Sequence, residues 1–397
     1  FLRRVDMQYK IPFIGRAHKY TQGEVDAVVS SMKSAVPLTQ GQYQQEFQEK
    51  FCKYIGADHA FALNNATAGL ELSAQLCQFK DGDEFICPSH TFTASAYPFI
   101  KKGGTPVWSD IDKDTRVVSL ETIKKCVTEK TKAIIVVHLY GFIIPDILEI
   151  AGFAKENDII LIEDVAQAMG TQVKAKKAGT FGDLGVFSFH SHKNITTLGE
   201  GGMLIVNNNK YAEILPMLRH NGHCTWDFER EKYWLPAMGN VDLPSLDGEY
   251  LMPSNYCLGE VECALGIELL DRLDEINDQK RVRAINFIEA LEEYDMLKFH
   301  KVNSIRHNYH LLVAYVADNK RDVFIERMSK EKSIQCVVQY YPLNRYDLYK
   351  KLGFGKADCP NSDDFFDNMV SIPFNHMLSD GDFKYILRST QEVLGEL

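Results

Sequence analysis

The sequence predicts an α/β protein in which a large domain, built on a mostly parallel seven-stranded sheet, precedes a smaller C-terminal α+β domain. From about residue 58, short and almost continuously apolar runs alternate with amphipathic ones, as in a parallel sheet covered by helices on both faces. After about residue 250, one long helical pattern comes first and a few mixed elements follow. We therefore expect residues 1–250 to form an N-terminal arm and the large domain, and residues 251–397 a bridging helix and the small domain.

Seven apolar runs supply the expected strands of the large sheet, and helical patterns follow the first four. The strand runs are HAFAL, EFICP, TPVWSDI, KAIIVVHL, DIILIED, LGVFSFH and GMLIVN, and the helical stretches cover 66–79, 93–102, 119–128 and 146–156.

The C-terminal part begins with GEVECALGIELLDRLDEINDQKRVRAINFIEALEEY, where apolar residues three and four apart predict a long bridging helix. In the small domain, NYHLLVAYV and IQCVVQYY read as strands, RDVFIERMSKEK reads as a helix, and a last helix begins near residue 381. The polar stretch 223–253 lies near the boundary between the two parts of the chain. Loops of this length usually have a function or are disordered.

Composition excludes several classes of protein. The net charge of −10 argues against a nucleic-acid or anionic-membrane partner, since both select clustered Lys and Arg. No apolar run reaches the roughly 20 residues of a membrane helix, and FLRRVDMQYK lacks the apolar core of a secretory signal, so we expect a cytoplasmic protein. The nine cysteines show no CxxC spacing and are expected to be reduced.

Asp164 ends the run DIILIED, and in an open α/β sheet ligands bind beyond the carboxyl ends of the strands. A carboxylate at this place can bind a metal, a ribose hydroxyl or a protonated ring nitrogen, or it can cap the next helix. Gln167 lies one helical turn further on the same side, so one ligand can contact both residues.

Lys193 follows LGVFSFH and precedes a glycine cluster. Most lysines lie on the surface, but a desolvated lysine is a nucleophile that can form a Schiff base. The stretch LNNATAGLELS, which contains Thr67, reads as a strand, a turn and a helix N-terminus, and such a terminus favours phosphate. A phosphate site, a strand-end carboxylate and a lysine are together what pyridoxal 5'-phosphate requires.

The sequence resembles the StrS/DegT-type sugar aminotransferases, which are pyridoxal-phosphate enzymes of the aspartate aminotransferase fold. The resemblance covers nearly the whole chain and is strongest in LIEDVAQAMG and GDLGVFSFHSHKNITTLGEGG, with PLTQG, CPSHTFTASAYPFIKKGGTPVWSDID, SNYCLGEVECALGIELL and VVQYYPL in matching order. It implies transfer of an amino group from L-glutamate to a keto sugar, typically nucleotide-linked, in amino-sugar biosynthesis for surface polysaccharide or similar products.

The resemblance also implies roles for individual residues. Lys193 is implied as the lysine that binds the cofactor and moves the proton, and Asp164 as the partner of the pyridine nitrogen. Asn255 is implied to reach the phosphate in a neighbouring subunit, which makes the protein a homodimer with shared sites. Further implied cofactor contacts are Gln167 at the ring hydroxyl, Phe92 on the ring face, and Thr67, Ala68 and Ser188 at the phosphate; our candidates for substrate contacts are Thr39, His138 and Tyr340.

The chain departs from the family pattern at several positions. Ala66 replaces the usual Gly before Thr67, Cys257 replaces an Arg, and Gln339 and Asn344 replace two His. These departures leave open an aminotransferase for a smaller phosphorylated ketone or a pyridoxal-phosphate-dependent sugar dehydratase. Some relatives carry His instead of the lysine, but the spacing F-S-F-x-x-x-K selects Lys193 rather than His192. A cofactor-binding regulator with little catalysis also stays open.

Other motifs give weaker predictions. The HNGHC spacing suits zinc, but Asn221 and Gly222 interrupt the helix it needs, so we predict no metal. His138 and Tyr140 at a strand end are expected either to line the site or to be buried with satisfied partners. Trp226 and Trp234 are expected either to cover a substrate or to pack their loop. NNATAG lacks the GxGxxG that a nicotinamide dehydrogenase needs.

Overall fold

The computed structural model describes residues 8–14, 18–222 and 243–397. Its large sheet has seven strands in the order β1-β9-β8-β5-β4-β2-β3, and only β9 runs antiparallel to its neighbours. The predicted mostly parallel sheet is therefore confirmed. Its strands are β1 (His59–Leu63), β2 (Glu84–Pro88), β3 (Thr105–Ser109), β4 (Thr131–Val137), β5 (Ile160–Asp164), β8 (Leu184–Ser188) and β9 (Gly202–Val206).

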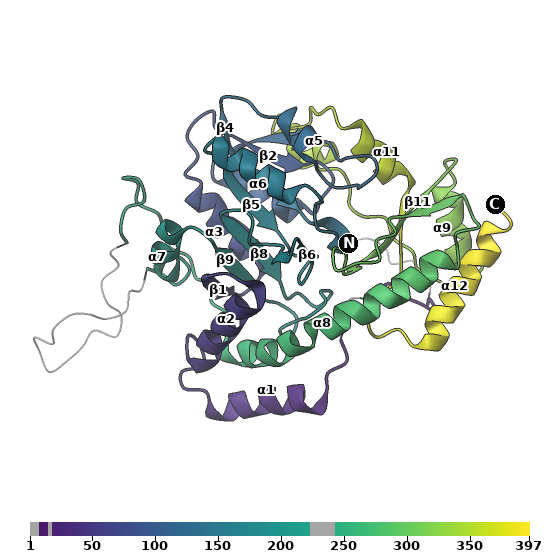
Figure 1. Ribbon diagram of the computed structural model, residues 1–397, viewed down its shortest axis with the longest axis horizontal. Helices are drawn as coiled ribbons and strands as arrows, with labels where there is room; N and C mark the ends of the chain where they lie inside the picture. The colour runs from purple at the N-terminus through teal and green to yellow at the C-terminus, as the bar shows by residue number, and fades with distance from the viewer. Residues whose placement is uncertain (1–7, 15–17, 223–242) are drawn as a thin grey trace, which may run out of the picture.

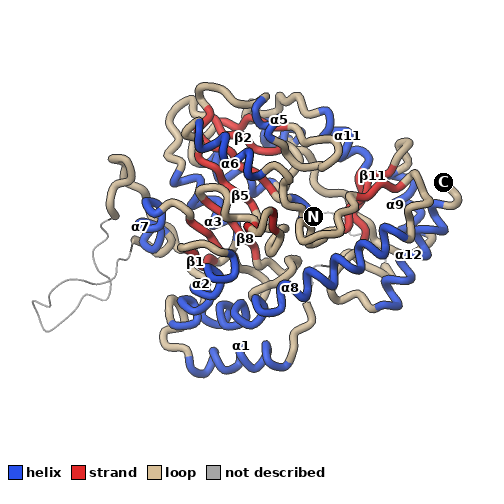
Figure 2. Tube along the Cα trace, in the orientation of Figure 1, coloured by secondary structure: helices blue, strands red, loops and turns tan. Residues whose placement is uncertain are grey.

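Helices surround this sheet, as Figure 2 shows in blue around the red strands. Helices α2 and α7 pack on β1, α3 on β8 and β9, and α6 on β5. The α-helices of this part are α1 (Gln22–Ser34), α2 (Gln42–Ile55), α3 (Ala66–Leu76), α4 (Tyr97–Lys101), α5 (Leu120–Lys124), α6 (Ile147–Glu156) and α7 (Asn209–Leu218). Short 3-10 turns are η1 (Thr93–Ser95) and η2 (Leu139–Gly141), and a hairpin is formed by β6 (Gln172–Val173) and β7 (Lys176–Lys177).

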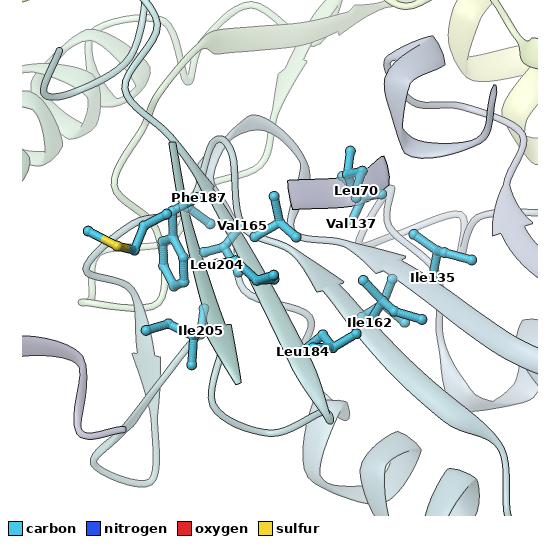
Figure 3. Packing of buried hydrophobic residues seen from close by; sticks show 14 of the residues in the cluster. Leu70, Ile135, Val137, Ile162, Val165, Leu184, Phe187, Leu204 and Ile205 are labelled. Atoms are coloured by element: carbon cyan, nitrogen blue, oxygen red, sulfur yellow. The ribbon is translucent and has the colours of Figure 1, made fainter. Parts of the chain in front are cut away.

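The sheet is buried because its strands are apolar on both faces. Residues such as Ile135, Ile162 and Leu184 are at most 1% exposed, and Figure 3 shows them packed with Leu70 of α3 and Phe187 of β8. Burial of such side chains contributes about 1.5–3 kcal/mol each, so this core fixes the positions of the strand ends.

Helix α8 (Glu260–Glu289) joins the two parts of the molecule, as predicted for the long helical pattern (Figure 1). Its first half packs into the core of the large sheet, and residues from Ala284 onward pack into a second hydrophobic core. That core covers an antiparallel sheet of order β10-β11-β12. The elements of this part are β10 (Leu297–Phe299), β11 (Leu312–Val316), α9 (Arg321–Lys330), η3 (Leu343–Arg345), α10 (Asp347–Lys351), α11 (Pro360–Asn368), β12 (Met369–Ile372) and α12 (Asp380–Leu394).

Some predicted elements differ from the structure. The strand predicted for 334–341 is wrong: Ile334 bridges Ile11 and Val337 bridges Ser371, but no continuous ladder forms. The segment pairs only briefly with β12 because it then turns toward the large domain, where the Gln339 carbonyl accepts a hydrogen bond from the Tyr140 hydroxyl at 2.8 Å. The helical stretch 93–102 consists of η1 and α4, and that at 119–128 is only the short α5.

The insertion at 223–253 is described only from residue 243 onward, and Trp226 and Trp234 lie outside the described residues. Its described end lies against α3, where the side-chain amides of Gln75 and Gln78 donate to the carbonyls of Met252 and Leu246. Within the described ranges, no helix is long and apolar enough to cross a membrane.

Candidate active site

The candidate site lies where the parallel strands end. Strands β1, β8, β5, β4 and β2 run in the same direction, so their carboxyl ends meet at one edge of the sheet. The register confirms this at Ser188, which pairs with Gly202, and at Asp164, which lies beside Val137. The loops at this edge carry most of the residues that the sequence selected: Phe92 after β2, His138 after β4, Gln167 after β5, Lys193 after β8, and Thr67 and Ala68 after β1.

Lys193 lies in the loop that follows β8 and is half-buried. The Lys193 backbone amide donates to the His190 carbonyl at 2.8 Å, and the Lys193 carbonyl oxygen lies 3.1 Å from a ring nitrogen of His18. Burial lowers the pKa of the Lys193 amine from 10.5 to about 8, against the opposing effect of the Asp164 carboxylate. The amine is therefore partly neutral near physiological pH, as a nucleophile or proton acceptor must be.

Asp164 is held in a fixed orientation at the end of β5. Its side chain is 6% exposed, Oδ2 accepts a hydrogen bond from Ser95 Oγ at 2.7 Å, and Oδ1 accepts one from the Ala166 amide at 3.0 Å. A carboxylate fixed in this way can pair with a cationic ring nitrogen without reorganising.

Gln167 connects two tyrosines at the same edge. Its Oε1 accepts a hydrogen bond from the Tyr140 amide at 2.6 Å, and its Nε2 donates to the Tyr340 hydroxyl at 2.9 Å. The ring of Phe92 meets Tyr340 edge to face, with 5.8 Å between the centroids, and stays 52% exposed. The structure thus brings Phe92, Gln167 and Tyr340 together, with an open aromatic face.

The N-terminus of α3 lies against Gly202, the residue that pairs with Ser188. The side chain of Asn65 accepts a hydrogen bond from the Ala68 amide at 2.8 Å, which leaves the other first-turn amides, at Ala66 and Thr67, without intrahelical partners. Gly202 lies directly below: a Cβ there would come within 2.6 Å of the Asn65 carbonyl carbon. These residues fit a phosphate, because amides at a helix N-terminus and a buried hydroxyl can donate to it.

Ala66 is accommodated although the family usually has Gly there. It is the first residue of α3, and it is not among the residues with positive φ. The β-carbon therefore causes no backbone strain at this turn.

Thr39 and Asn255 are exposed. Thr39 forms a bridge with Gly259, and Asn255 forms one with His220, so both belong to one surface region. The bridge between Leu63 and Cys257 ties this region to the end of β1.

His138 is fully buried, and both ring nitrogens have partners within the fold. Its Nε2 lies 2.9 Å from Glu163 Oε2, and its Nδ1 accepts a hydrogen bond from the Ile144 amide at 3.1 Å. The structure therefore matches the alternative of a buried histidine with satisfied partners, and the ring has no free nitrogen to offer a substrate.

The departures from the family pattern have structural explanations in part. Gln339 holds Tyr140 through its carbonyl, and its side-chain amide lies 3.4 Å from Ser371 Oγ. Cys257 is half-buried, and burial raises the pKa of its thiol, so a neutral thiol stands where the family usually has the positive charge of Arg. Asn344 is buried, and its Oδ1 has no hydrogen-bond partner among the described residues.

Sequence reasoning missed Ser95 and named Tyr140 without its contacts. Ser95, in the stretch SHTFTAS, was not singled out, although its place just after β2 puts it at the same edge. Tyr140 has φ of 60°, and its hydroxyl lies 2.6 Å from His90 Nε2, a contact that only the fold creates. Within the described residues, no group of three or more potential metal ligands gathers, and His223 and Cys224 of HNGHC lie outside those residues.

Comparison with known proteins gives consistent matches over nearly the whole chain. The family model of the DegT/DnrJ/EryC1/StrS aminotransferases matches residues 19–391. The uncharacterized protein MJ1066 of Methanocaldococcus jannaschii is 31% identical over 379 residues, which are 94% of this chain and 95% of that protein. GDP-perosamine synthase of Vibrio cholerae is 29% identical over 381 residues, covering 95% of this chain and 96% of the synthase.

Among solved structures, Spr1654 of Streptococcus pneumoniae in its PMP form superposes with a TM-score of 0.85 at 27% identity, covering 97% of this chain and 99% of that one. The same protein was also solved in a PLP form, which superposes with a TM-score of 0.82 at 26% identity over 98% of this chain and 99% of that one. PLP and PMP are pyridoxal and pyridoxamine phosphate, the two forms between which an aminotransferase cofactor alternates.

Proposed function

This chain belongs to the DegT/DnrJ/EryC1/StrS aminotransferase family, and we propose that it uses pyridoxal 5'-phosphate to move an amino group from L-glutamate to a nucleotide-linked keto sugar. The observation that carries the proposal is the half-buried Lys193 amine, whose pKa is lowered to about 8 at the sheet edge that also holds Asp164. Such an amine next to a fixed carboxylate is what the chemistry needs.

The residues of the sheet edge fit the cofactor part by part. We assign the phosphate to the first-turn amides of α3 and to Ser188, and the ring nitrogen to Asp164. Gln167 keeps one N–H of its amide beyond the bond to Tyr340, and we assign it to the ring hydroxyl. The exposed ring of Phe92 would cover one face of the cofactor. When bound, pyridoxal phosphate would carry the amino group between the two substrates and withdraw electrons from the carbon that loses its proton.

Lys193 is the residue that we assign to proton transfer. Its Nζ would first take the proton from the carbon that bears the amino group. It would then give that proton back in a later step of the same transfer. Because its pKa is lowered to about 8, the amine lies close to neutral pH and can both accept and donate the proton. Ser95 and the Ala166 amide hold Asp164 in place, which keeps its charge where the ring nitrogen would lie.

The keto-sugar acceptor and the homodimer are proposals with separate support. A nucleotide-linked sugar is favoured by the match to GDP-perosamine synthase. A homodimer is favoured by large apolar side chains that stay exposed in the chain segments around Thr39 and Asn255, because monomeric proteins rarely expose large apolar patches. These side chains are Met32, Val36, Leu38, Tyr250 and Met252. In a dimer, Asn255 would reach the phosphate of the other subunit's site.

The test is a two-stage assay with the purified chain. L-glutamate is added to protein loaded with pyridoxal phosphate, and conversion to the pyridoxamine form is followed by absorbance. Nucleotide-linked keto sugars and small phosphorylated ketones are then offered to the aminated form. Aminated sugar supports the proposal. If only the small ketones are aminated, the result supports the smaller-ketone enzyme. Loss of a sugar hydroxyl without amination supports the dehydratase, and no turnover at all supports the regulator.

A further inference from the structure

A small cavity of about 30 Å³ lies behind the Lys193 loop, between the two parts of the molecule. It is formed by the N-terminal segment, the loop after β8, α8, the segment before β11 and the segment after β12, and the residues that matter here are Phe13, His192, Lys280, His310, Phe374 and Asn375. Residues from both parts of the molecule line the cavity, so a ligand here would contact both.

Lys280 is a buried cation without a carboxylate partner. Its side chain is 5% exposed, and Nζ donates to Asn194 Oδ1 at 2.8 Å and to the His310 carbonyl at 3.1 Å. Among the described residues it forms no ion pair, and burial alone lowers its pKa to about 7. An ammonium group has three N–H donors, so one has no hydrogen-bond acceptor here, and Nζ also lies 5.6 Å from the centroid of the Phe374 ring. With a pKa of about 7 the amine is about half charged at neutral pH, and an anion bound in the cavity would stabilise its charged form.

His310 also lines this cavity, and one of its polar atoms lacks a partner. It is 5% exposed, and its Nδ1 is buried with no hydrogen-bond partner in the described part of the chain. Burial lowers the pKa of His310 well below its ordinary value, and the positive charges of Lys193 and Lys280 contribute. A buried ring nitrogen of this kind costs free energy unless a ligand or water satisfies it.

The cavity is connected to the candidate active site. Asn194, which holds Lys280, directly follows Lys193, and the Leu311 amide next to His310 donates to the Tyr140 carbonyl at 3.3 Å. A group bound to Lys280 and His310 would thus lie close to the lysine that we assign to proton transfer, and an anion there would compensate the positive charge gathered around it.

We propose that this cavity binds a carboxylate of the amino donor through Lys280 Nζ and a ring nitrogen of His310. The inference rests on the proposed aminotransferase function, because it takes the donor to be an amino acid. A carboxylate has two oxygens, one for each unused polar atom, and its charge would restore pairing for Lys280. Lys280 and His310 would then either select dicarboxylic donors or hold the end of the donor that carries its α-carboxylate.

The test measures binding of glutarate, a dicarboxylate without an amino group, to the full-length protein loaded with pyridoxal phosphate, by calorimetry. We compare the wild type with Lys280→Met, with the charge-retaining Lys280→Arg, and with Lys384→Met as a matched control on the exposed face of α12. Lys280→Met should weaken glutarate binding about 10- to 100-fold, as expected for loss of one hydrogen bond to a charged group. Lys280→Arg and Lys384→Met should stay within about threefold of the wild type, well below that loss.

Equal affinity of the wild type and Lys280→Met, or no glutarate binding by the wild type, would overturn the proposal. If Lys280→Met does not fold, His310→Leu decides in the same way, with unchanged affinity overturning it. Because glutarate cannot be aminated or act as a donor, this outcome is independent of whether the protein transfers amino groups. The half-saturating concentrations of L-glutamate and L-glutamine, measured for the wild type and Lys280→Met, then identify which carboxylate is bound. A rise in the variant with glutamate alone indicates the distal carboxylate, and a rise with both donors indicates the α-carboxylate.

Discussion

The charge balance at Lys193 gives a prediction whose sign follows from the structure. Burial lowers the pKa of its amine to about 8, and the negative charge of Asp164 acts in the opposite direction. At pH 7 an amine with a pKa near 8 is roughly one tenth neutral, whereas at 10.5 it would be roughly three parts in ten thousand neutral, a difference of about 300-fold. Asp164→Asn removes the opposing charge and leaves burial, so the pKa of Lys193 should fall further, by about 1.

The assay is trace acetylation of the full chain between pH 6 and 11, with the extent of labelling at Lys193 read by peptide mass spectrometry. An added lysine-containing peptide serves as the reference for reagent decay. The labelling rate of Lys193 should reach half its maximum near pH 8 in the wild type and at lower pH in Asp164→Asn. A wild-type midpoint near 10.5, or a midpoint that rises in the variant, would refute the assignment of a desolvated amine facing Asp164.

Further predictions concern the groups around the site. Ser95→Ala leaves an oxygen of the buried Asp164 without its donor, and we expect about 10-fold weaker pyridoxal-phosphate binding in a fluorescence titration, the effect of about 1–2 kcal/mol; unchanged affinity would contradict the role of Ser95. Glu163→Gln places an amide where the carboxylate accepts from three backbone amides and contacts His138, and urea unfolding should show a loss of about 3 kcal/mol. Gly202→Ala pushes a β-carbon against the N-terminus of α3, and both melting temperature and phosphate affinity should fall, whereas a normal phosphate affinity would argue against a phosphate site there. Val36→Asp charges a side chain that is 92% exposed, and sedimentation should show monomers if the apolar patch is the dimer interface; a dimer that survives would place the interface elsewhere.

The alternation of apolar runs predicted the large sheet well because strands buried on both faces must be apolar throughout. The sites at its edge followed from the same reasoning, since strand ends such as Asp164 must meet there. The segment 334–341 shows where this reasoning fails. Its residues have a strand's apolar pattern, but Ile334 and Cys336 pack into the small core while Tyr340 turns to Gln167.

Contacts between distant segments left no local signal. The pairing of Ser95 with Asp164 joins residues 69 positions apart, and the contact of Lys280 with Asn194 joins residues 86 apart. A lysine such as Lys280 in an amphipathic helix pattern reads as solvent-exposed, and only the packing of α8 between the two cores shows that it is buried. For His138, sequence could name both possibilities, but only the hydrogen bonds of its two ring nitrogens decide between them.

The most direct test of the account is to identify the lysine that binds the cofactor. The full chain is incubated with pyridoxal phosphate, reduced with borohydride, digested and mapped by mass spectrometry. We predict that the phosphopyridoxyl mass appears on the peptide that contains Lys193, and that Lys193→Ala loses it. The mass on Lys280 or on any other lysine instead, or no stable label at all, would contradict the central claim that Lys193 and the edge around Asp164 form the active site.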